Sequence, residues 1–228
     1  MATRFYMSDD TFSTVAIPTI GTWGATISDH VTQFMYPTNP GDMAFVLESV
    51  GGSGQGTRKM RTLVSEGLSA GIDLTNAMVS WNCRYGQSSS SANTFSLFAV
   101  GIINSAGVLQ QSLTGIKDST EIVTNTGTPS SRFNTGTTAF THTTSLNDRL
   151  VVQVGWDQDG SGSYTQVFSR GNTSGTDLSS TEGDTDIQNP WFEIDKTITF
   201  GGGEPPPPAS NEDWEATLYI SAILDEWV

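Results

Sequence analysis

The chain has 228 residues, with 24 acidic and 10 basic side chains and a formal net charge of −14. Such a surface repels phosphate groups, so we exclude direct binding of nucleic acid and docking on anionic lipid. Only 15% of the residues are charged, and the polar bulk comes from Ser, Thr, Asn and 24 Gly, a mixture that favours strands and turns over helices. The N-terminal residues show no signal-peptide pattern and no segment has the length and hydropathy of a membrane span, so we expect synthesis in a cytoplasm without standard export.

Residues 1–40 differ from the rest of the chain. Pro18, Pro37 and Pro40 interrupt them, yet they hold too many aromatic residues for a disordered tail. Two interpretations stay open: an extended N-terminal arm that lies on a sheet or on a neighbouring subunit, or edge strands of the main domain. We therefore divide the chain into residues 1–40 and a β-sandwich domain over residues 41–228.

From residue 41 onward, apolar side chains alternate with polar ones, which is typical of strands with one buried face. The pattern predicts strands at about 43–49, 58–66, 77–85, 94–103, 108–113, 138–144, 149–156, 164–170, 192–200 and 215–224. The glycine-rich residues 51–56 are expected to form a hairpin loop, and residues 117–137 a long surface loop. Four prolines at 205–208 predict a stiff exposed connection. Together these elements predict an all-β fold, an antiparallel, jelly-roll-like β-sandwich with an extended N-terminal arm.

Cys83 is the only cysteine, so no internal disulfide can form. Trp81 and Tyr85 share its face of the predicted strand. We therefore expect a small buried thiol rather than a reactive one.

The segment Asp157-Gln158-Asp159-Gly160-Ser161-Gly162 allows two interpretations. Oxygen-bearing side chains at its first, third and fifth positions, followed by glycine, match the start of a calcium loop, with Asp157, Asp159 and Ser161 as metal ligands. The twelfth position is Phe168 where such a loop has glutamate, and no helices flank it. A plain hairpin turn explains the same residues and is the favoured interpretation. Calcium is the one cofactor that the sequence suggests.

Catalytic patterns are incomplete. The chain has two histidines, His30 and His142, but no serine elbow and no paired Cys or His spacing for zinc. Residues 191–195, Trp-Phe-Glu-Ile-Asp, resemble the catalytic strand of laminarinase-type glycoside hydrolases, whose pattern is Glu-x-Asp-x-x-Glu. Ile198 replaces the final acid, and glycoside hydrolysis requires two separate carboxyl groups. We therefore expect that the protein is not an enzyme.

A second resemblance covers more of the chain. Residues 1–6, 148–155, 170–172 and 190–192 resemble, in pattern and order, a group of tailed-bacteriophage virion proteins. The resemblance implies a structural β-sandwich displayed on the exterior of the virion, either a capsid decoration subunit or a tail component, assembled in the host cytoplasm. Its expected partners are the major capsid protein or other virion subunits, together with copies of itself in a symmetric oligomer such as a trimer.

A carbohydrate-binding β-sandwich module, used for attachment to a host surface or glycan, is the alternative function. Exposed tryptophans supply stacking platforms for sugar rings, whereas tryptophans on the inner faces belong to the core. The candidates are Trp23, Trp81, Trp156, Trp191, Trp214 and Trp227.

Overall fold

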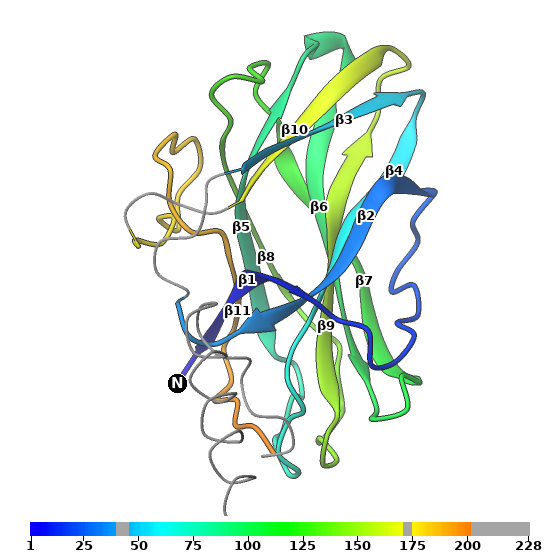
Figure 1. The fold of residues 1–228 in the computed structure, drawn as a ribbon, viewed down its shortest axis with the longest axis vertical. Coiled ribbons are helices and arrows are strands. Elements are labelled where there is room, and N and C mark those ends of the chain that lie inside the picture. The colour runs from blue at the N-terminus through cyan, green and yellow to red at the C-terminus, as the bar shows by residue number, and fades with distance from the viewer. Residues whose placement is uncertain (40–45, 171–174, 202–228) are drawn as a thin grey trace, which may run out of the picture.

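Strands make up almost all of the regular structure in this computed structural model, which describes residues 1–39, 46–170 and 175–201 (Figure 1). Eleven strands join into one sheet, and a short 3₁₀ helix (η1, Ser90–Ala92) precedes β6. The strands are β1 (Thr3–Thr11), β2 (Ala25–Tyr36), β3 (Val46–Ser53), β4 (Gly56–Val64), β5 (Met78–Gln87), β6 (Thr94–Ile103), β7 (Leu109–Glu121), β8 (Ser130–Thr137), β9 (Arg149–Gln158), β10 (Ser163–Arg170) and β11 (Trp191–Ile194). The prediction of an all-β fold is confirmed.

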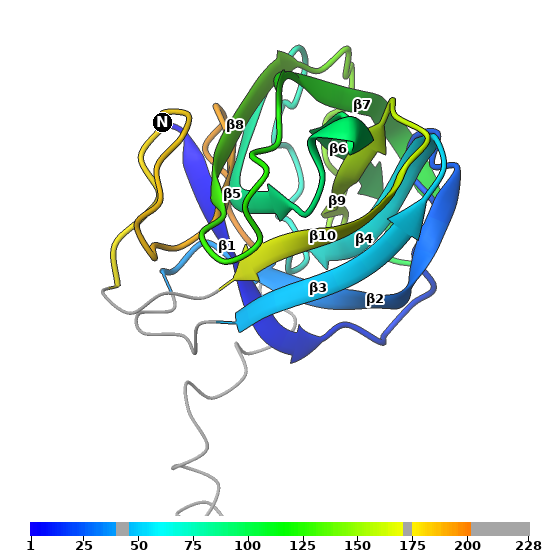
Figure 2. The ribbon, with the colours of Figure 1, turned by 90° about the horizontal axis from the view of Figure 1, so that it is seen from above.

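The pairing of eight strands is that of a jelly roll. β3 pairs with β10, β4 with β9, β5 with β8 and β6 with β7, all antiparallel, so that the pairs nest within one another along the chain. Pairing of β10 with β5 and of β9 with β6 then gives two four-stranded sheets, β3-β10-β5-β8 and β4-β9-β6-β7. Viewed from above, the two sheets wrap around a common interior (Figure 2). The jelly-roll-like sandwich expected from the alternating pattern is therefore present.

The three remaining strands connect the two sheets. β11 pairs with β5, β1 lies between β11 and β2, and β2 pairs with β4. The β2–β4 pair is parallel, which differs from the purely antiparallel arrangement expected. For residues 1–40 the sequence left an arm or edge strands open. The structure places β1 and β2 inside the strand path, and Phe5, Met7 and Met35 belong to the central core.

The connection between β1 and β2, residues 12–24, crosses the outer face of the β4-β9-β6 sheet. It is the blue segment at the right of Figure 1. Phe12 and Ile20 pack there against Val64 and Val151 in a second apolar cluster. Gln153, which is fully buried, accepts a hydrogen bond from the Ile20 backbone N–H (2.7 Å) and donates one to the Pro18 carbonyl (3.0 Å). We call residues 12–24 the strap.

The interior of the sandwich is filled by large side chains. Trp81, Trp156, Phe98 and Phe168 are at most 1% exposed and belong to one continuous cluster. Trp156 Nε1–H donates to the Tyr164 hydroxyl at 2.6 Å, so that the buried indole nitrogen is satisfied. Alternation along β5, β6, β9 and β10 places these side chains on the inside, as the sequence predicts.

Several predicted boundaries are wrong. Gly51 and Gly52, expected in a hairpin loop, lie in β3, where Gly52 packs against the Tyr164 hydroxyl and has no room for a side chain. The predicted loop 117–137 contains the end of β7 and all of β8, because Thr- and Ser-rich segments form strands when neighbours pair with them. Residues 138–144 contribute only one isolated bridge, and the predicted strand 192–200 ends at Ile194. The prolines at 205–208 and the predicted strand 215–224 lie outside the described residues.

Replacing Gln153 tests how the strap is held. Gln153→Ala leaves the buried Ile20 N–H and Pro18 carbonyl without partners, so we expect a loss of about 2 kcal/mol in the free energy of unfolding, measured by urea denaturation. The matched control is Gln110→Ala, because Gln110 is exposed. Equal stability of the two variants contradicts this account of the strap.

Candidate functional site

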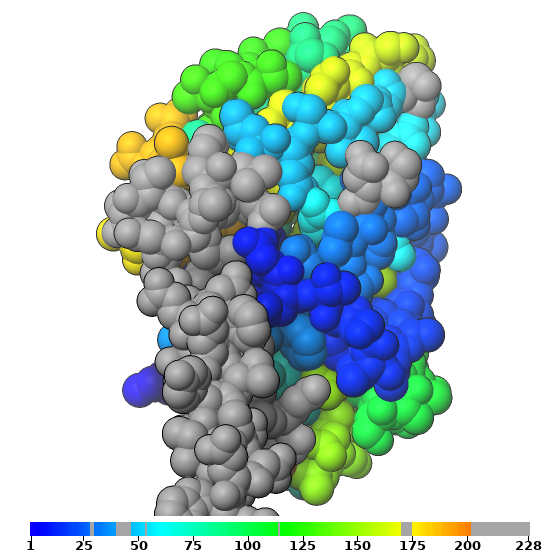
Figure 3. All heavy atoms as spheres, in the orientation of Figure 1, coloured from blue at the N-terminus to red at the C-terminus, as the bar shows by residue number. Residues whose placement is uncertain are grey.

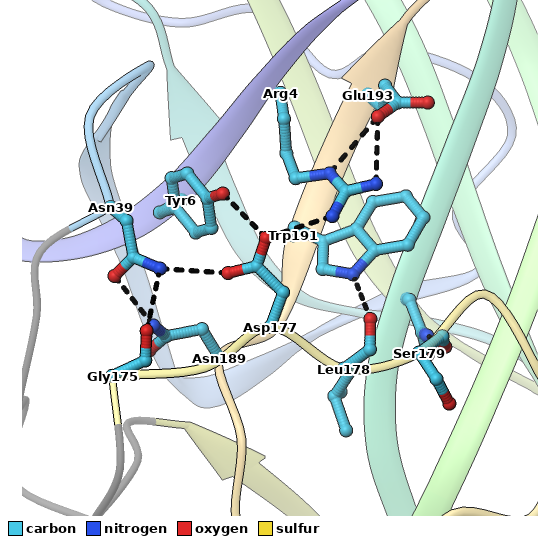
Figure 4. Close-up of polar contacts among 11 residues, drawn as sticks. Arg4, Tyr6, Asn39, Gly175, Asp177, Leu178, Ser179, Asn189, Trp191 and Glu193 are labelled. Atoms are coloured by element: carbon cyan, nitrogen blue, oxygen red, sulfur yellow. Dashed lines mark hydrogen bonds and ion pairs between the residues drawn. The ribbon is translucent and has the colours of Figure 1, made fainter.

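A polar cluster joins strand β1 to the segment before β11 (Figure 4). The Arg4 guanidinium donates to Asp177 Oδ2 at 2.9 Å and to Glu193 Oε2 at 3.1 and 2.9 Å from Nε and Nη2. The same guanidinium lies 4.0 Å from the centre of the Trp191 ring, a cation–π contact. We call these four residues and their neighbours in Figure 4 the Arg4 cluster.

Asp177 is the centre of this cluster. It accepts hydrogen bonds from the Tyr6 hydroxyl at 2.8 Å and from Asn39 Nδ2 at 2.8 Å. Asn189 in turn donates to the Asn39 side-chain oxygen at 2.8 Å. The Asp177 carboxylate therefore links β1, the residues that follow β2 and residues 175–193.

Burial, followed by the nearby charge of Asp177, raises the pKa of Tyr6 to about 12. The phenol stays neutral at physiological pH and serves as a donor. With each carboxylate bound by a cation or a donor, the arrangement suits structural clamping rather than proton transfer.

The two acids of the resemblance to glycoside hydrolases do not act as a pair in the structure. Glu193 binds Arg4, whereas Asp195 accepts a hydrogen bond from the Met78 backbone N–H at 3.0 Å. Each carboxylate therefore has a partner of its own in the structure. That the protein is not an enzyme stays a prediction.

The loop 157–162 connects β9 of one sheet to β10 of the other. β9 pairs with β4 and β6, whereas β10 pairs with β3 and β5, so the predicted hairpin turn is wrong and the segment is a turn between sheets. Lys117 of β7 places its ammonium 2.8 Å from Asp157 Oδ2 and 3.0 Å from Asp159 Oδ2. A cation therefore already bridges the two carboxylates proposed as calcium ligands. For Ser161, the third proposed ligand, the structure shows no bond to that pair among the described contacts. Calcium binding here stays a prediction, and it requires displacement of Lys117.

Contacts with η1 give the loop its shape. The Gly160 N–H donates to the Ala92 carbonyl at 2.9 Å, and a side chain at Gly160 would collide with the Ser91 carbonyl. Gln158 Nε2 donates to the carbonyls of Gly160 and Gly162 at 2.7 and 3.0 Å. Packing against η1 thus explains why position 160 is glycine, and a metal ion is not needed to explain it. Within the described ranges, no group of three His, Cys, Asp or Glu side chains is placed to hold a metal ion.

The two histidines lie apart, each with a structural partner. His30 of β2 shares a 2.9 Å hydrogen bond with Thr62, and burial, aided by Lys59 and Arg61, lowers its pKa to about 4. His142 lies 2.7 Å from Asp148. His30 is therefore neutral at physiological pH.

Cys83 is fully buried and donates to the Ser169 carbonyl, which confirms the predicted structural thiol. Burial raises its pKa well above the usual value. The tryptophans are buried too: Trp81, Trp156 and Trp191 are at most 1% exposed, and only Trp23 is partly exposed among the described ones. Trp214 and Trp227 lie outside the described residues.

An open groove lies between β3 and β10 of one sheet and β2 and β4 on the other side. It has a volume of about 580 Å³. Its lining comes from β2, β3, β4 and the start of β10: Ala25, Thr26, Ile27, Val50, Gly51, Gly52, Arg58, Ser163 and Tyr164. In the space-filling view, β3 lies above β2 on this side of the molecule (Figure 3). We call this feature the β2–β3 groove.

The comparisons with known proteins are sparse. No known family and no curated protein matches the chain. A chain from the structure of infectious bursal disease virus Gx strain is similar over 81% of this chain and 48% of that chain, with 12% identity and a TM-score of 0.24. One from the Gt strain of the same virus is similar over the same shares, with 13% identity and a TM-score of 0.22. The chain spans about half the length of these virus chains, and TM-scores this low do not define a shared fold.

Sequence analysis missed both the Arg4 cluster and the β2–β3 groove. Arg4 and Asp177 are 173 positions apart, and no local pattern connects them. The groove is lined by residues of β2, β3, β4 and β10, which lie far apart in the sequence, so no local pattern predicts it. Among the described residues, no helix has the length and hydropathy needed to cross a membrane.

The pKa of Tyr6 predicts an alkaline transition. Because folding raises this pKa from 10.0 to about 12, the contribution of the neutral phenol to stability is complete below pH 10 and is lost as the pH rises through 12. We expect the unfolding free energy of the wild-type protein to fall by up to about 2 kcal/mol more over this interval than that of Tyr6→Phe. Identical pH profiles of the two proteins contradict the bond between Tyr6 and Asp177.

Lys117 and calcium are expected to compete. Because the ion pairs of Lys117 are partly exposed, Lys117→Ala should lower the unfolding free energy by about 0.5–1 kcal/mol. Millimolar calcium should then raise the melting temperature of Lys117→Ala more than that of the wild-type protein, because the two carboxylates have lost their ammonium. Magnesium is the control ion. If the melting temperature of Lys117→Ala responds to neither ion, the loop is a plain turn that binds no calcium.

Proposed function

We propose that the chain is a structural subunit of a bacteriophage particle, which binds capsid or tail subunits as a decoration or assembly component. The observation that carries this proposal is the filled jelly roll. Its interior holds Trp81, Trp156, Phe98 and Phe168 in one cluster, so function is left to the outer surface and the strand edges.

The chemistry of the polar clusters agrees with this role. Arg4, Lys117 and Arg132 bind acids from distant segments of the same chain. These ion pairs hold distant segments of the subunit together. A rigid subunit suits a protein that presents a fixed surface to its neighbours. Jelly rolls also occur in lectins and cupins, so the fold alone does not decide between functions.

The net charge of −14 favours a place on the particle exterior, away from packaged DNA. The expected partners are the major capsid protein or other virion subunits, with a symmetric homo-oligomer such as a trimer as the assembling unit. Assembly in the host cytoplasm fits a chain whose only described thiol is free and buried.

Binding to particles that lack the protein tests this function. Purified full-length chain is added to such particles, which are then isolated by sedimentation, and the bound chain is measured by mass spectrometry. We expect saturable binding with a fixed number of copies per particle. Val108→Asp and Leu146→Asp are informative variants, because these residues are 56% and 57% exposed apolar side chains and their change spares the core. Absence from purified virions, together with no binding to depleted particles, overturns the proposal.

The carbohydrate-binding alternative now depends on Trp23 among the described tryptophans. Trp23 of the strap packs against the second apolar cluster and is partly exposed. A glycan array distinguishes the two functions: micromolar sugar binding that is lost in Trp23→Ala supports attachment to glycans.

A further inference from the structure

The β2–β3 groove separates two strand edges that lack a strand neighbour among the described residues. β3 is the last strand of the sheet path and pairs only with β10. β2 pairs with β4 at residues 25–26 and 31–34, but with β1 only from Gln33 onward. Its first half, which includes Ala25, Thr26 and Ile27, therefore faces the groove. Unpaired strand edges are sites where another extended segment can add by backbone hydrogen bonds.

We propose that residues 211–228 of this chain dock in the β2–β3 groove as an added strand. The described structure ends at Gly201, and 27 of the 228 residues follow it. The proposal concerns the binding of a segment by a surface, and it does not depend on the function proposed above.

The sequence of this segment fits a half-buried strand. Leu218, Ile220, Ala222 and Leu224 alternate with Thr217, Tyr219 and Ser221. Such a period of two places the apolar side chains on one face. The groove offers apolar contacts to that face from Ile27, Val50 and Tyr164.

Charge also fits. Arg58, one of the ten basic residues of the chain, lines the groove. Residues 211–228 contain no basic residue, and their acids are Glu212, Asp213, Glu215, Asp225 and Glu226. In a protein that is negative overall, the guanidinium of Arg58 is a favourable neighbour for such a segment.

Tethering helps the segment to find the groove. Nine residues, 202–210, separate Gly201 from the segment, and fully extended they reach about 30 Å. A tether that spans the distance to the groove keeps the local concentration of the segment high within the same chain.

Cysteine crosslinking in the full-length chain tests the docking. Thr26→Cys combined with Ser221→Cys places one thiol at the groove and one in the segment, while the native Cys83 is fully buried. We expect a disulfide between positions 26 and 221 under mild oxidation, identified by peptide mass spectrometry. Val108→Cys with Ser221→Cys is the control pair, because Val108 is exposed and is not part of the groove lining.

Position 51 provides a charge test with matched bulk. A Cβ at Gly51 meets no atom within 4 Å, so both Gly51→Glu and Gly51→Lys are compatible with the fold. Added to the crosslinking pair, Gly51→Glu should lower the disulfide yield at least threefold relative to Gly51→Lys, because it repels the acidic segment. A disulfide within one chain or between two chains supports the docking, and the mass of the product tells which copy supplies the segment. Equal yields in the two Gly51 variants, or as much crosslinking at Val108 as at Thr26, overturn the proposal.

Discussion

β5 is the strand on which the rest of the structure depends. One of its edges pairs with β8, and the other is divided between β11 at residues 79–82 and β10 at residues 84–87. One face of the same strand carries Val79, Trp81, Cys83 and Tyr85, all fully buried in the core. Pairing and burial thus act on the same residues. Through β11, this strand also fixes β1 and β2, which close the path to the second sheet.

Basic residues are scarce in this protein, and the structure uses several of them as connectors. Arg4 joins β1 to Asp177 and Glu193, and Arg61 joins β4 to Glu48 of β3. Lys117 joins β7 to the loop between β9 and β10. Each pair links segments that are distant in sequence, so the ion pairs report tertiary arrangement rather than local structure. Where side chains stay partly exposed, each contributes modestly to stability.

The filled interior and the unpaired edges of β2 and β3 together indicate which surfaces are available for function. With aromatic side chains occupying the space between the sheets, the interior of the jelly roll is a core and not a ligand chamber. The features that remain available for binding another chain are the open groove between strand edges and the acidic surface. Both properties suit a subunit that works by contact with other chains, which is the role we propose.

The sequence by itself determined the strand-rich class, the buried faces of β5 and β9, a turn at residues 157–162 and the buried thiol of Cys83, because alternation and turn chemistry are local properties. Only the tertiary structure decided that β1 and β2 lie within the sheet, that Gly51 and Gly52 continue β3, and that the Thr- and Ser-rich residues 130–137 form β8. The same holds for the bond between Lys117 and the two aspartates of the loop. These features arise from pairing between segments far apart in the chain, where the partner supplies the hydrogen bonds and the burial that no local pattern encodes.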